Sequence, residues 1–257
     1  MMRGFRWNLS WIAVMVLIAG CGHKQAQVSY PAPPPIPAPA PPVSPAKPAP
    51  GSDTTAAAPS LPADSADDQQ FVATHQPIHS EEGRASWYGP PYHNRRGANG
   101  QVFDQNAITA AHRMLPMNSL IRVTNLQTGQ TAVMRVTDRG PFVPDRVIDL
   151  SMASAKLVGV WRPGVAQVRI DVYAAPKPID EGGRWCVQIG AFDHEAKALK
   201  LQAHLERMYT TANVIEFTGP TGHWVRIRPA NDDKAKAMEI ARTLNPDEGN
   251  AYLVRLD

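Results

Sequence analysis

The chain has 257 residues, with 26 Lys and Arg against 23 Asp and Glu, and a formal net charge of +3. Its two cysteines, Cys21 and Cys186, are too few for a disulfide framework, so a scaffold stapled by several bridges is excluded. Cys186 lies within an apolar, strand-like run. We expect a buried, inert thiol there rather than a reactive or metal-binding one.

The N-terminus has the pattern of an export signal. Arg3 and Arg6 precede an unbroken apolar run over residues 11–19, which is too short to span a bilayer as a permanent helix. Small residues stand directly before Cys21, and this arrangement resembles the lipobox of bacterial lipoproteins. The resemblance implies that residues 1–20 are a lipoprotein signal peptide and that Cys21 carries acyl chains such as palmitate, which bind a membrane. A plain secretory signal, with an incidental cysteine, is the alternative.

Residues 21–82 are predicted to be a linker without a core. Residues 31–62 alone hold 13 of the 25 prolines and no aromatic residue, so they cannot bury enough apolar area to offset the entropy of ordering. Polyproline II rises about 3.1 Å per residue, which gives a reach on the order of 100 Å. Gly22 follows Cys21 in place of an aspartate, which by analogy favours the periplasmic face of the outer membrane. A spacer with no length requirement is the alternative to a tether.

Two small domains are predicted after the linker, at residues 83–175 and 184–257, with a Pro- and Gly-rich joint between them. The first has eleven Lys and Arg against five Asp and no Glu, while the second has ten basic and ten acidic residues. A basic domain favours an anionic polymer, such as the cell wall with its carboxylates. Nucleic acid is another polyanion, but the export signal argues against it.

The first domain is predicted to be all-β with one short helix. Strand-like runs at 120–124 and 131–136 flank a hairpin loop that contains Gly129. Residues 165–173 alternate between apolar and polar side chains, as a half-buried strand does. Residues 151–158 are predicted to be a helix. Short strands that close on themselves favour a small barrel.

Four blocks follow one another in residues 83–142: GRASWYG, GANGQVFD, ITAAH and VTDRGPF. They resemble the double-psi β-barrel of the rare lipoprotein A family, which is distantly related to expansins, and the resemblance covers residues 83–173. It implies a peptidoglycan lytic transglycosylase that acts at the septum on glycan strands lacking stem peptides. Such an enzyme needs one acid/base, which protonates the glycosidic oxygen and then accepts the proton of the C6 hydroxyl as a 1,6-anhydro ring closes. No water attacks, in contrast to ordinary glycoside hydrolases.

The resemblance places the catalytic residues by position. The family's acidic residue after Asn-Gly falls on Gln101, whose amide cannot transfer a proton as a carboxyl group does, while His112 and Asp138 match the family. Residues 83–175 contain no glutamate to replace Gln101, so a surviving acid must be an aspartate, with Asp138 the first candidate and Asp104 the second. A turn-stabilising role for Asp138 and a core position for His112 are the alternatives.

Tyr88, Asn99 and Arg139 are predicted to bind the substrate. Strand alternation should turn only one of Trp87 and Tyr88 toward a groove, because neighbouring residues of a strand face opposite sides. Asn99 begins a tight turn. Gly97, just before it, is a second departure from the family, which often has threonine there. The chain lacks the paired cysteine or histidine spacing of a zinc site, so we expect neither a metal nor a cofactor.

The second domain contains an internal quasi-repeat. The sequence VQI at 187–189 returns as VRI at 225–227, and a helix-like segment follows each. With two more strands at 214–217 and 252–256, the order is βαββαβ, which forms a four-stranded sheet with both helices on one face. The blocks WCVQIGAF and HWVRI resemble the SPOR (sporulation-related repeat) domain, a small α+β module whose family binds denuded septal glycan.

The other face of this sheet is predicted to be open. Strand alternation turns the apolar residues of the repeat toward the helices, and the outward residues would be Gln188, Trp224, Arg226, Leu253 and Arg255. A tryptophan beside arginine and glutamine suits stacking on a sugar with hydrogen bonds to hydroxyls and a carboxylate. Packing of Trp224 against the first domain or the linker is the alternative.

Two functions remain as hypotheses. The first is an endolytic lytic transglycosylase, a lipoprotein of the outer membrane that faces the periplasm, is enriched at the division septum and forms 1,6-anhydromuramoyl ends. The second is a non-catalytic, expansin-like protein that binds septal glycan. The amide of Gln101, at the family's acidic position, favours this second hypothesis. In both, the expected partners are peptidoglycan, the outer membrane through lipidated Cys21, and division-site proteins, but no nucleic acid.

Overall fold

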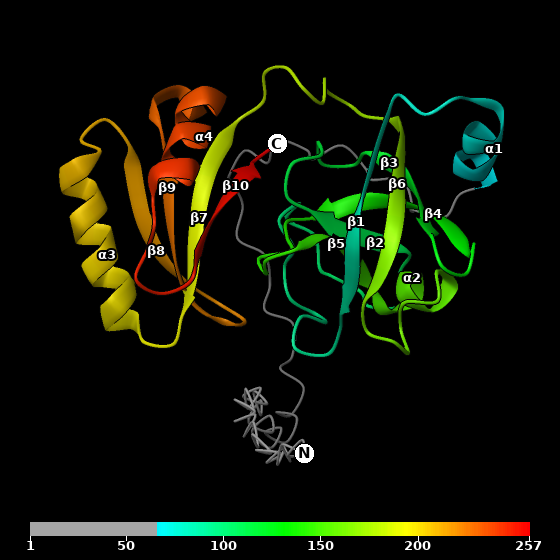
Figure 1. Ribbon diagram of the computed structural model, residues 1–257, viewed down its shortest axis with the longest axis horizontal. Coiled ribbons are helices and arrows are strands. Elements are labelled where there is room, and N and C mark those ends of the chain that lie inside the picture. Colours follow the sequence, from blue (N-terminus) through cyan, green and yellow to red (C-terminus); the bar gives the residue numbers. More distant parts are fainter. Residues whose placement is uncertain (1–65) are drawn as a thin grey trace, which may run out of the picture. The chain divides into compact units, whose positions relative to one another are not determined.

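A computed structural model describes residues 66–257 of the chain (Figure 1). The predicted signal sequence, Cys21 and the proline-rich segment lie outside the described residues, so what the sequence predicts for them stays a prediction. Within residues 66–257, no helix combines the length and the apolar character that crossing a membrane requires.

The first domain is a closed barrel of six strands in the order β1-β5-β2-β4-β3-β6. The strands are β1 (His79–Tyr88), β2 (Thr109–His112), β3 (Leu120–Asn125), β4 (Thr131–Asp138), β5 (Arg146–Ser151) and β6 (Ala166–Ala174). β1 runs parallel to β5, and β2 runs parallel to β4, whereas the other pairs are antiparallel. This mixed, closed barrel confirms the predicted double-psi fold class.

Alternating strands supply the barrel core. Val168, Ile170 and Val172 of β6 are fully buried, as the alternation of that strand predicts. Gly129 closes the hairpin between β3 and β4 with a φ of 73°, which glycine adopts without steric strain. The predicted short helix is α2 (Met152–Leu157), and Ser151 caps it by accepting a hydrogen bond from the backbone N–H of Ser154.

The barrel begins earlier than the sequence predicts. β1 pairs with β6 from His79 onward, with His79 opposite Val172. The strand therefore includes Glu81 and Glu82, which a boundary at residue 83 leaves out. The inference that this domain contains no glutamate is wrong for that reason, and Glu81 has a defined partner in the barrel, described below.

Helix α1 (Ala66–Thr74) lies inside the segment predicted to be a coreless linker. Val72 is buried and packs with Leu120 and Tyr173 of the barrel. The Asp68 carboxylate accepts hydrogen bonds from the Arg135 guanidinium at 2.5 and 3.0 Å. The linker prediction is therefore wrong for this helix, because an apolar contact and an ion pair attach it to the barrel.

The second domain is a four-stranded antiparallel sheet in the order β10-β7-β9-β8. Its elements are β7 (Trp185–Phe192), α3 (Glu195–Met208), β8 (Asn213–Gly219), β9 (Gly222–Arg228), the 3₁₀ helix η1 (Ala230–Asp232), α4 (Lys234–Thr243) and β10 (Asn250–Arg255). Val187, Ile189, Val225 and Ile227 are fully buried in one core with residues of α3 and α4. The predicted βαββαβ order and the position of both helices on one face are confirmed (Figure 1).

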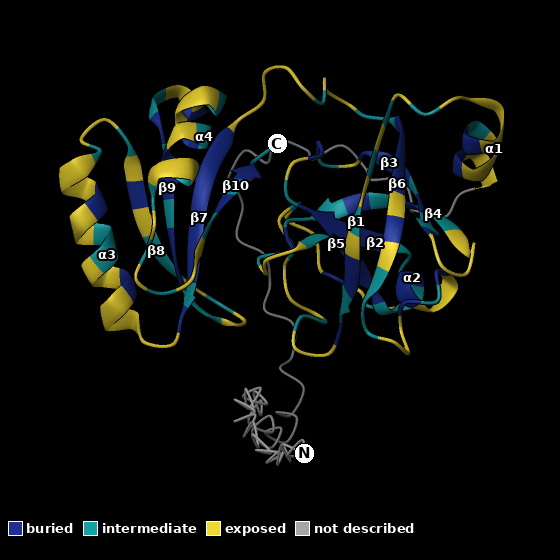
Figure 2. Cartoon of the chain, in the orientation of Figure 1, coloured by how far each residue is buried: buried dark blue, intermediate teal, exposed yellow. Residues whose placement is uncertain are grey.

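The opposite face of this sheet is covered rather than open. Figure 2 shows β7 as buried along most of its length. Gln188 is 4 % exposed and Trp224 is 5 % exposed, and the Trp224 ring centre lies 5.3 Å from that of Phe142 in the barrel. The open-face prediction is therefore wrong, because an aromatic side chain of the barrel packs on this face.

Two further residues lie on the other side of the sheet from where they are predicted. Leu253 pairs with Val187 and Arg255 pairs with Trp185. Paired residues of antiparallel strands face the same side, so Leu253 packs into the helix-side core. Arg255 is fully buried, with its guanidinium 5.6 Å from the Trp185 ring centre. Neither side chain is available on the face that carries Trp224.

We predict that Val72→Asp releases helix α1 from the barrel, because it places a carboxylate among apolar side chains. The matched control is Ala73→Asp, since Ala73 is an exposed residue of the same helix. Hydrogen exchange measured by mass spectrometry should become faster over residues 66–74 in the Val72 variant alone, with the barrel strands unchanged. Equal exchange in the two variants would contradict the docking of this helix.

Candidate functional site

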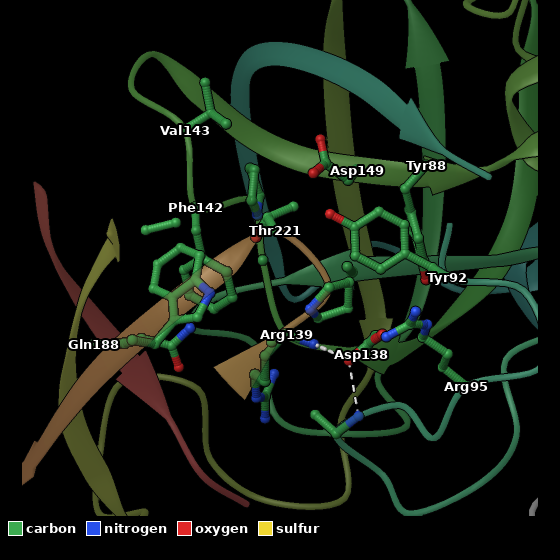
Figure 3. Close-up of a pocket in the computed structure, with 18 of the residues that line it drawn as sticks. Tyr88, Tyr92, Arg95, Asp138, Arg139, Phe142, Val143, Asp149, Gln188 and Thr221 are labelled. Atoms are coloured by element: carbon green, nitrogen blue, oxygen red, sulfur yellow. Dashed lines mark hydrogen bonds between the residues drawn. The ribbon is translucent and has the colours of Figure 1, made fainter. Parts of the chain in front are cut away.

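A pocket of about 390 Å³ lies beside the Asp-Arg-Gly-Pro-Phe block (Figure 3). Its volume falls in the range of small-molecule and cofactor sites. The barrel contributes Tyr88, Asp138 and Asp149 to the lining, and the sheet contributes Gln188 and Trp224. The pocket therefore brings together residues that are far apart in the sequence, including two carboxyl groups.

Asp138, at the end of β4, is held by the backbone. Its Oδ1 accepts hydrogen bonds from the N–H groups of Ala98 and Arg139, each at 2.8 Å. Burial raises the pKa of Asp138 above its usual value, although these two hydrogen bonds and the Arg139 charge oppose the shift. A Cβ atom on Gly97 would lie 3.3 Å from Oδ2. The glycine at this family threonine position thus leaves one edge of the carboxyl group uncrowded.

Asp149, on β5, is a pocket residue that the sequence analysis does not select. The Ser86 hydroxyl donates to its Oδ1 at 2.6 Å, and an Arg146 guanidinium nitrogen lies 3.5 Å from its Oδ2. Burial raises the pKa of Asp149, against the opposing effects of Arg146 and Ser86. One sequence signal was available, since Asp149 is a lone acidic residue between the core residues Ile148 and Leu150.

Tyr88 stands within electrostatic reach of both carboxyl groups. Burial, followed by the charges of Asp138 and Asp149, raises the pKa of Tyr88 well above its usual value, so the phenol stays neutral. Its ring stacks on Phe103 with a centre-to-centre distance of 4.3 Å. Trp87, the preceding residue, packs against the barrel core instead. The predicted alternation of Trp87 and Tyr88 is confirmed.

His112 lies outside the pocket lining, and the barrel engages both of its ring nitrogens. Nδ1 accepts hydrogen bonds from the backbone N–H groups of Met114 and Leu115, at 3.1 and 3.0 Å. Nε2 lies 2.9 Å from an Oε1 of Glu81. The side chain is only 3 % exposed. This geometry suits a histidine that fixes the strand β2 and the loop after it.

Gln101, Asn99 and Asp104 also lie outside the pocket lining. The Asn99 side chain bonds both to the backbone N–H of Gln101, at 2.9 Å, and to its Oε1, at 3.0 Å. Asp104 accepts a hydrogen bond from the N–H of Asn106, and its side chain is 56 % exposed. The structure thus brings Asp138 into the pocket but leaves the second candidate acid on the surface.

Arg139 lines the pocket, yet backbone carbonyls bind its guanidinium. Nη1 donates to the carbonyl oxygens of His112 and Leu115, at 3.0 and 2.7 Å, and Nη2 donates to that of Asp257 at 2.8 Å. Burial, together with nearby Arg255, lowers the pKa of Arg139 to about 10, so it stays charged at neutral pH. Arg139 therefore links the turn after β4 to the segment after β2 and to Asp257, which follows β10.

The sheet side of the pocket is built around Trp224. A Cβ atom on Gly190 would lie 2.8 Å from the Trp224 ring, so the close contact requires glycine. Arg226 donates a hydrogen bond to Gln188 Oε1 at 2.9 Å. On the same face, Cys186 is buried, and burial raises the pKa of its thiol to about 11, so it stays protonated at neutral pH. The part of the chain that the structure describes holds no cluster of three or more His, Cys, Asp or Glu suited to a metal ion.

Fold and site together define the class of protein, a double-psi β-barrel whose pocket contains two carboxyl groups, joined to a SPOR-type module. Residues 80–170 match the family model described as "Lytic transglycolase", and residues 181–255 match the model described as "SPOR domain". The chain belongs to the rare lipoprotein A family.

Several curated relatives share the name "Endolytic peptidoglycan transglycosylase RlpA". The chain is 36 % identical to the one from Vibrio cholerae over 181 residues, which cover 68 % of each protein. It is 37 % identical to the one from Campylobacter jejuni over 165 residues, covering 55 % of this chain and 60 % of that relative. The matched region thus spans 60 % of the Campylobacter relative and 68 % of the Vibrio relative. Among solved structures, "Streptomyces papain inhibitor (SPI)" is 19 % identical, with a TM-score of 0.32 over 38 % of this chain and 97 % of that one.

We predict that Glu81→Gln destabilises the barrel by about 1 kcal/mol at pH 7 by removing a charge-assisted hydrogen bond to His112. Burial alone would raise the pKa of Glu81, but the hydrogen bond from His112, together with the charge of nearby Arg113, outweighs it and lowers that pKa. The stabilisation is therefore present above the usual glutamate pKa, about 4.3, and is lost as the pH falls through the lower folded-state value.

Urea unfolding from pH 7 down to pH 3 measures this effect. The gap between the native chain and the Glu81 variant should close at the acidic end. Glu82→Gln is the matched control, since Glu82 is the exposed neighbour on the same strand, and it should unfold like the native chain throughout. A Glu81 variant as stable as the control at pH 7 would contradict the role given to this pair.

Proposed function

We propose that this protein cleaves the glycan strands of peptidoglycan as a lytic transglycosylase and leaves 1,6-anhydromuramoyl ends. The observation that carries the proposal is Asp138, a half-buried carboxyl group that lines the pocket and whose pKa is raised by its desolvation there. The names of the relatives point to the same reaction. A general acid works best when its pKa is moved toward the operating pH.

In this reaction Asp138 acts first as an acid and then as a base. Its proton passes to the glycosidic oxygen as the bond from C1 of muramic acid breaks. The oxygen of the C6 hydroxyl then bonds to C1, and its proton returns to the Asp138 carboxylate. One carboxyl group therefore completes the cycle without water.

We also propose where the protein acts. Lipidation of Cys21 would anchor it in the outer membrane, facing the periplasm, and the proline-rich segment would let it reach the cell wall. The SPOR module would hold it on septal strands that lack stem peptides, near division-site proteins. What supports this is the sequence of the N-terminus together with the SPOR match.

A second function, glycan binding without cleavage in the manner of expansins, is favoured by one specific observation. Gln101 stands where the family has an acidic residue, and an amide neither donates nor accepts a proton as a carboxyl group does. The pocket would then serve as a binding groove. Cleavage of glycan strands decides between the two functions.

We predict that the native chain releases 1,6-anhydromuramoyl ends slowly from purified, peptide-free glycan strands, and that Gln101→Glu increases the rate by adding a proton carrier. Asp138→Asn should lower the rate by roughly 10²–10⁴-fold. Chromatography with mass spectrometry of the digests measures the ends. Asp145→Asn is the control, since Asp145 is exposed and outside the pocket lining.

The alternative outcomes are distinct. Strand binding without any release, by the native chain and by Gln101→Glu alike, would establish the binding function instead. Release at ordinary enzyme rates that survives both Asp138→Asn and Asp104→Asn would remove the assignment of the acid to an aspartate.

We predict that Trp224→Ala weakens binding to naked glycan strands by roughly tenfold, because Trp224 lines the pocket and packs against Phe142, so its removal disrupts this wall of the pocket. Trp161→Ala is the matched control, since Trp161 is a partly exposed tryptophan of the barrel outside the pocket lining. Co-sedimentation with denuded cell-wall sacculi measures the affinity. Equal binding by the two variants would exclude Trp224 from the glycan site.

A further inference from the structure

We propose that Asp149 is a second catalytic group of the pocket, whose carboxylate form stabilises the positive charge that develops at C1 of muramic acid as Asp138 protonates the glycosidic oxygen. This inference rests on the proposed function and deepens it. It assigns to Asp149 a role in which the residue forms no covalent bond to the substrate.

Strand register places the two carboxyl groups on either side of Ala111. Ala111 of β2 is opposite Asp138 on β4 and opposite Asp149 on β5. Residues in one row across a sheet face the same side, and all three residues line the pocket. Figure 3 shows Asp138 and Asp149 in the same pocket as Tyr88 and Tyr92.

The spacing of this row suits a sugar ring. Neighbouring strands are about 4.8 Å apart, so the α-carbons of Asp138 and Asp149, two strands apart, are on the order of 10 Å from each other. Between them Ala111 offers only a methyl group. Glycan-cleaving enzymes use two carboxyl groups with room for a sugar between them, where one acts on the glycosidic oxygen and the other acts on the sugar carbon.

The hydrogen bonds give the two groups different roles. At Asp149, Oδ1 accepts a hydrogen bond from the Ser86 hydroxyl and Oδ2 forms an ion pair with the Arg146 guanidinium at 3.5 Å. Both contacts favour the ionised carboxylate and oppose the burial that raises its pKa. At Asp138 both hydrogen bonds fall on Oδ1. Within the described residues Oδ2 of Asp138 has no hydrogen bond, so this oxygen is the one that can carry the proton.

Each step of the reaction then balances. The Asp138 proton goes to the leaving oxygen as the C1–O bond breaks, the C6 oxygen bonds to C1, and the C6 hydroxyl proton returns to Asp138. Meanwhile C1 carries positive charge, and Asp149 is the nearby fixed negative charge. Removing one preorganised electrostatic contact of this kind typically lowers kcat by about 10²–10³-fold.

Asp171 provides a matched control for Asp149. It is also a strand aspartate held by a serine and an arginine, with Ser80 donating to Oδ1 at 2.8 Å and Arg122 donating to Oδ2 at 3.0 Å. It lies on β6, outside the pocket lining. A purely structural role for the Ser-Asp-Arg set would therefore make the two aspartates respond alike to substitution.

The test compares Asp149→Asn with Asp171→Asn in the full chain, on peptide-free glycan strands, in whichever background is faster, native or Gln101→Glu. We expect Asp149→Asn to lower kcat for anhydro-end release by about 10²-fold while KM and strand binding stay within twofold. Asp171→Asn should retain kcat. Ser86→Ala keeps the Asp149 charge but loosens its position, so it should lower kcat by a smaller factor.

Three results would overturn the assignment. One is a kcat for Asp149→Asn equal to that of Asp171→Asn. Another is a loss in Asp149→Asn that appears in KM alone, since that would make Asp149 a binding residue. If Asp149→Asn does not fold, by its melting curve, then an unchanged kcat in Ser86→Ala overturns it. By contrast, if neither the native chain nor Gln101→Glu releases anhydro ends, the proposed function is wrong, and this inference is wrong with it.

Discussion

The pocket depends on one irregularity in the register of the barrel. β2 and β4 run parallel with Ala110 opposite Val136, and a shift then places Asp138, rather than Thr137, opposite Ala111. Side chains alternate along a strand, so a shift of one residue changes the face on which the next side chain lies. Without this shift Thr137 would occupy the row next to Ala111, and the pocket would hold a single carboxyl group.

Environment, more than residue type, distinguishes the pocket carboxyl groups from others in the barrel. Burial disfavours the charge of both Asp149 and Asp171. At Asp171 the Ser80 hydroxyl and the guanidinium groups of Arg122 and Arg169, the latter two at 3.0 and 3.3 Å, together outweigh burial and lower the pKa. At Asp149 the Arg146 guanidinium is more distant, at 3.5 Å, and the pKa is raised. A carboxylate less fully compensated by its own protein has more to gain from a positive charge on a substrate.

The sequence predicts most of the fold because its signals are local. Alternation along β6 and the glycine in the β3–β4 loop each lie within a few residues, and so do the paired strand-helix units of the second domain. The predictions that fail depend on contacts between distant segments. The sequence around Val72 contains no pattern that predicts its burial against Leu120 and Tyr173. Trp224 is covered by Phe142, some eighty residues earlier in the chain.

The candidate site divides in the same way. Motif positions lead directly to Asp138, since it follows β4 in a recognisable block. Asp149 becomes a pocket residue only through the pairing of β1, β5 and β2, which sets Ser86 opposite Asp149 on one side and Ala111 opposite it on the other. A lone acidic residue in an apolar strand is by itself a weak indication of a functional site. Only the strand register shows that Asp149 lies beside Ala111 and Asp138 in the pocket.

Gln101 affects the chemistry without affecting the architecture that supports it. The turn that contains it is closed by backbone hydrogen bonds, from the N–H of Gly97 to the carbonyl of Gln101 and from the N–H of Gly100 to the carbonyl of Gly97. The same turn supplies the Ala98 N–H that binds Asp138. An amide at position 101 therefore removes one possible proton carrier and leaves the turn and its bond to Asp138 in place. Asp138 and Asp149 differ in the contacts of their oxygens, so proton transfer and charge stabilisation can be divided between them. The pocket therefore keeps a carboxylic acid although the exposed turn carries an amide at position 101.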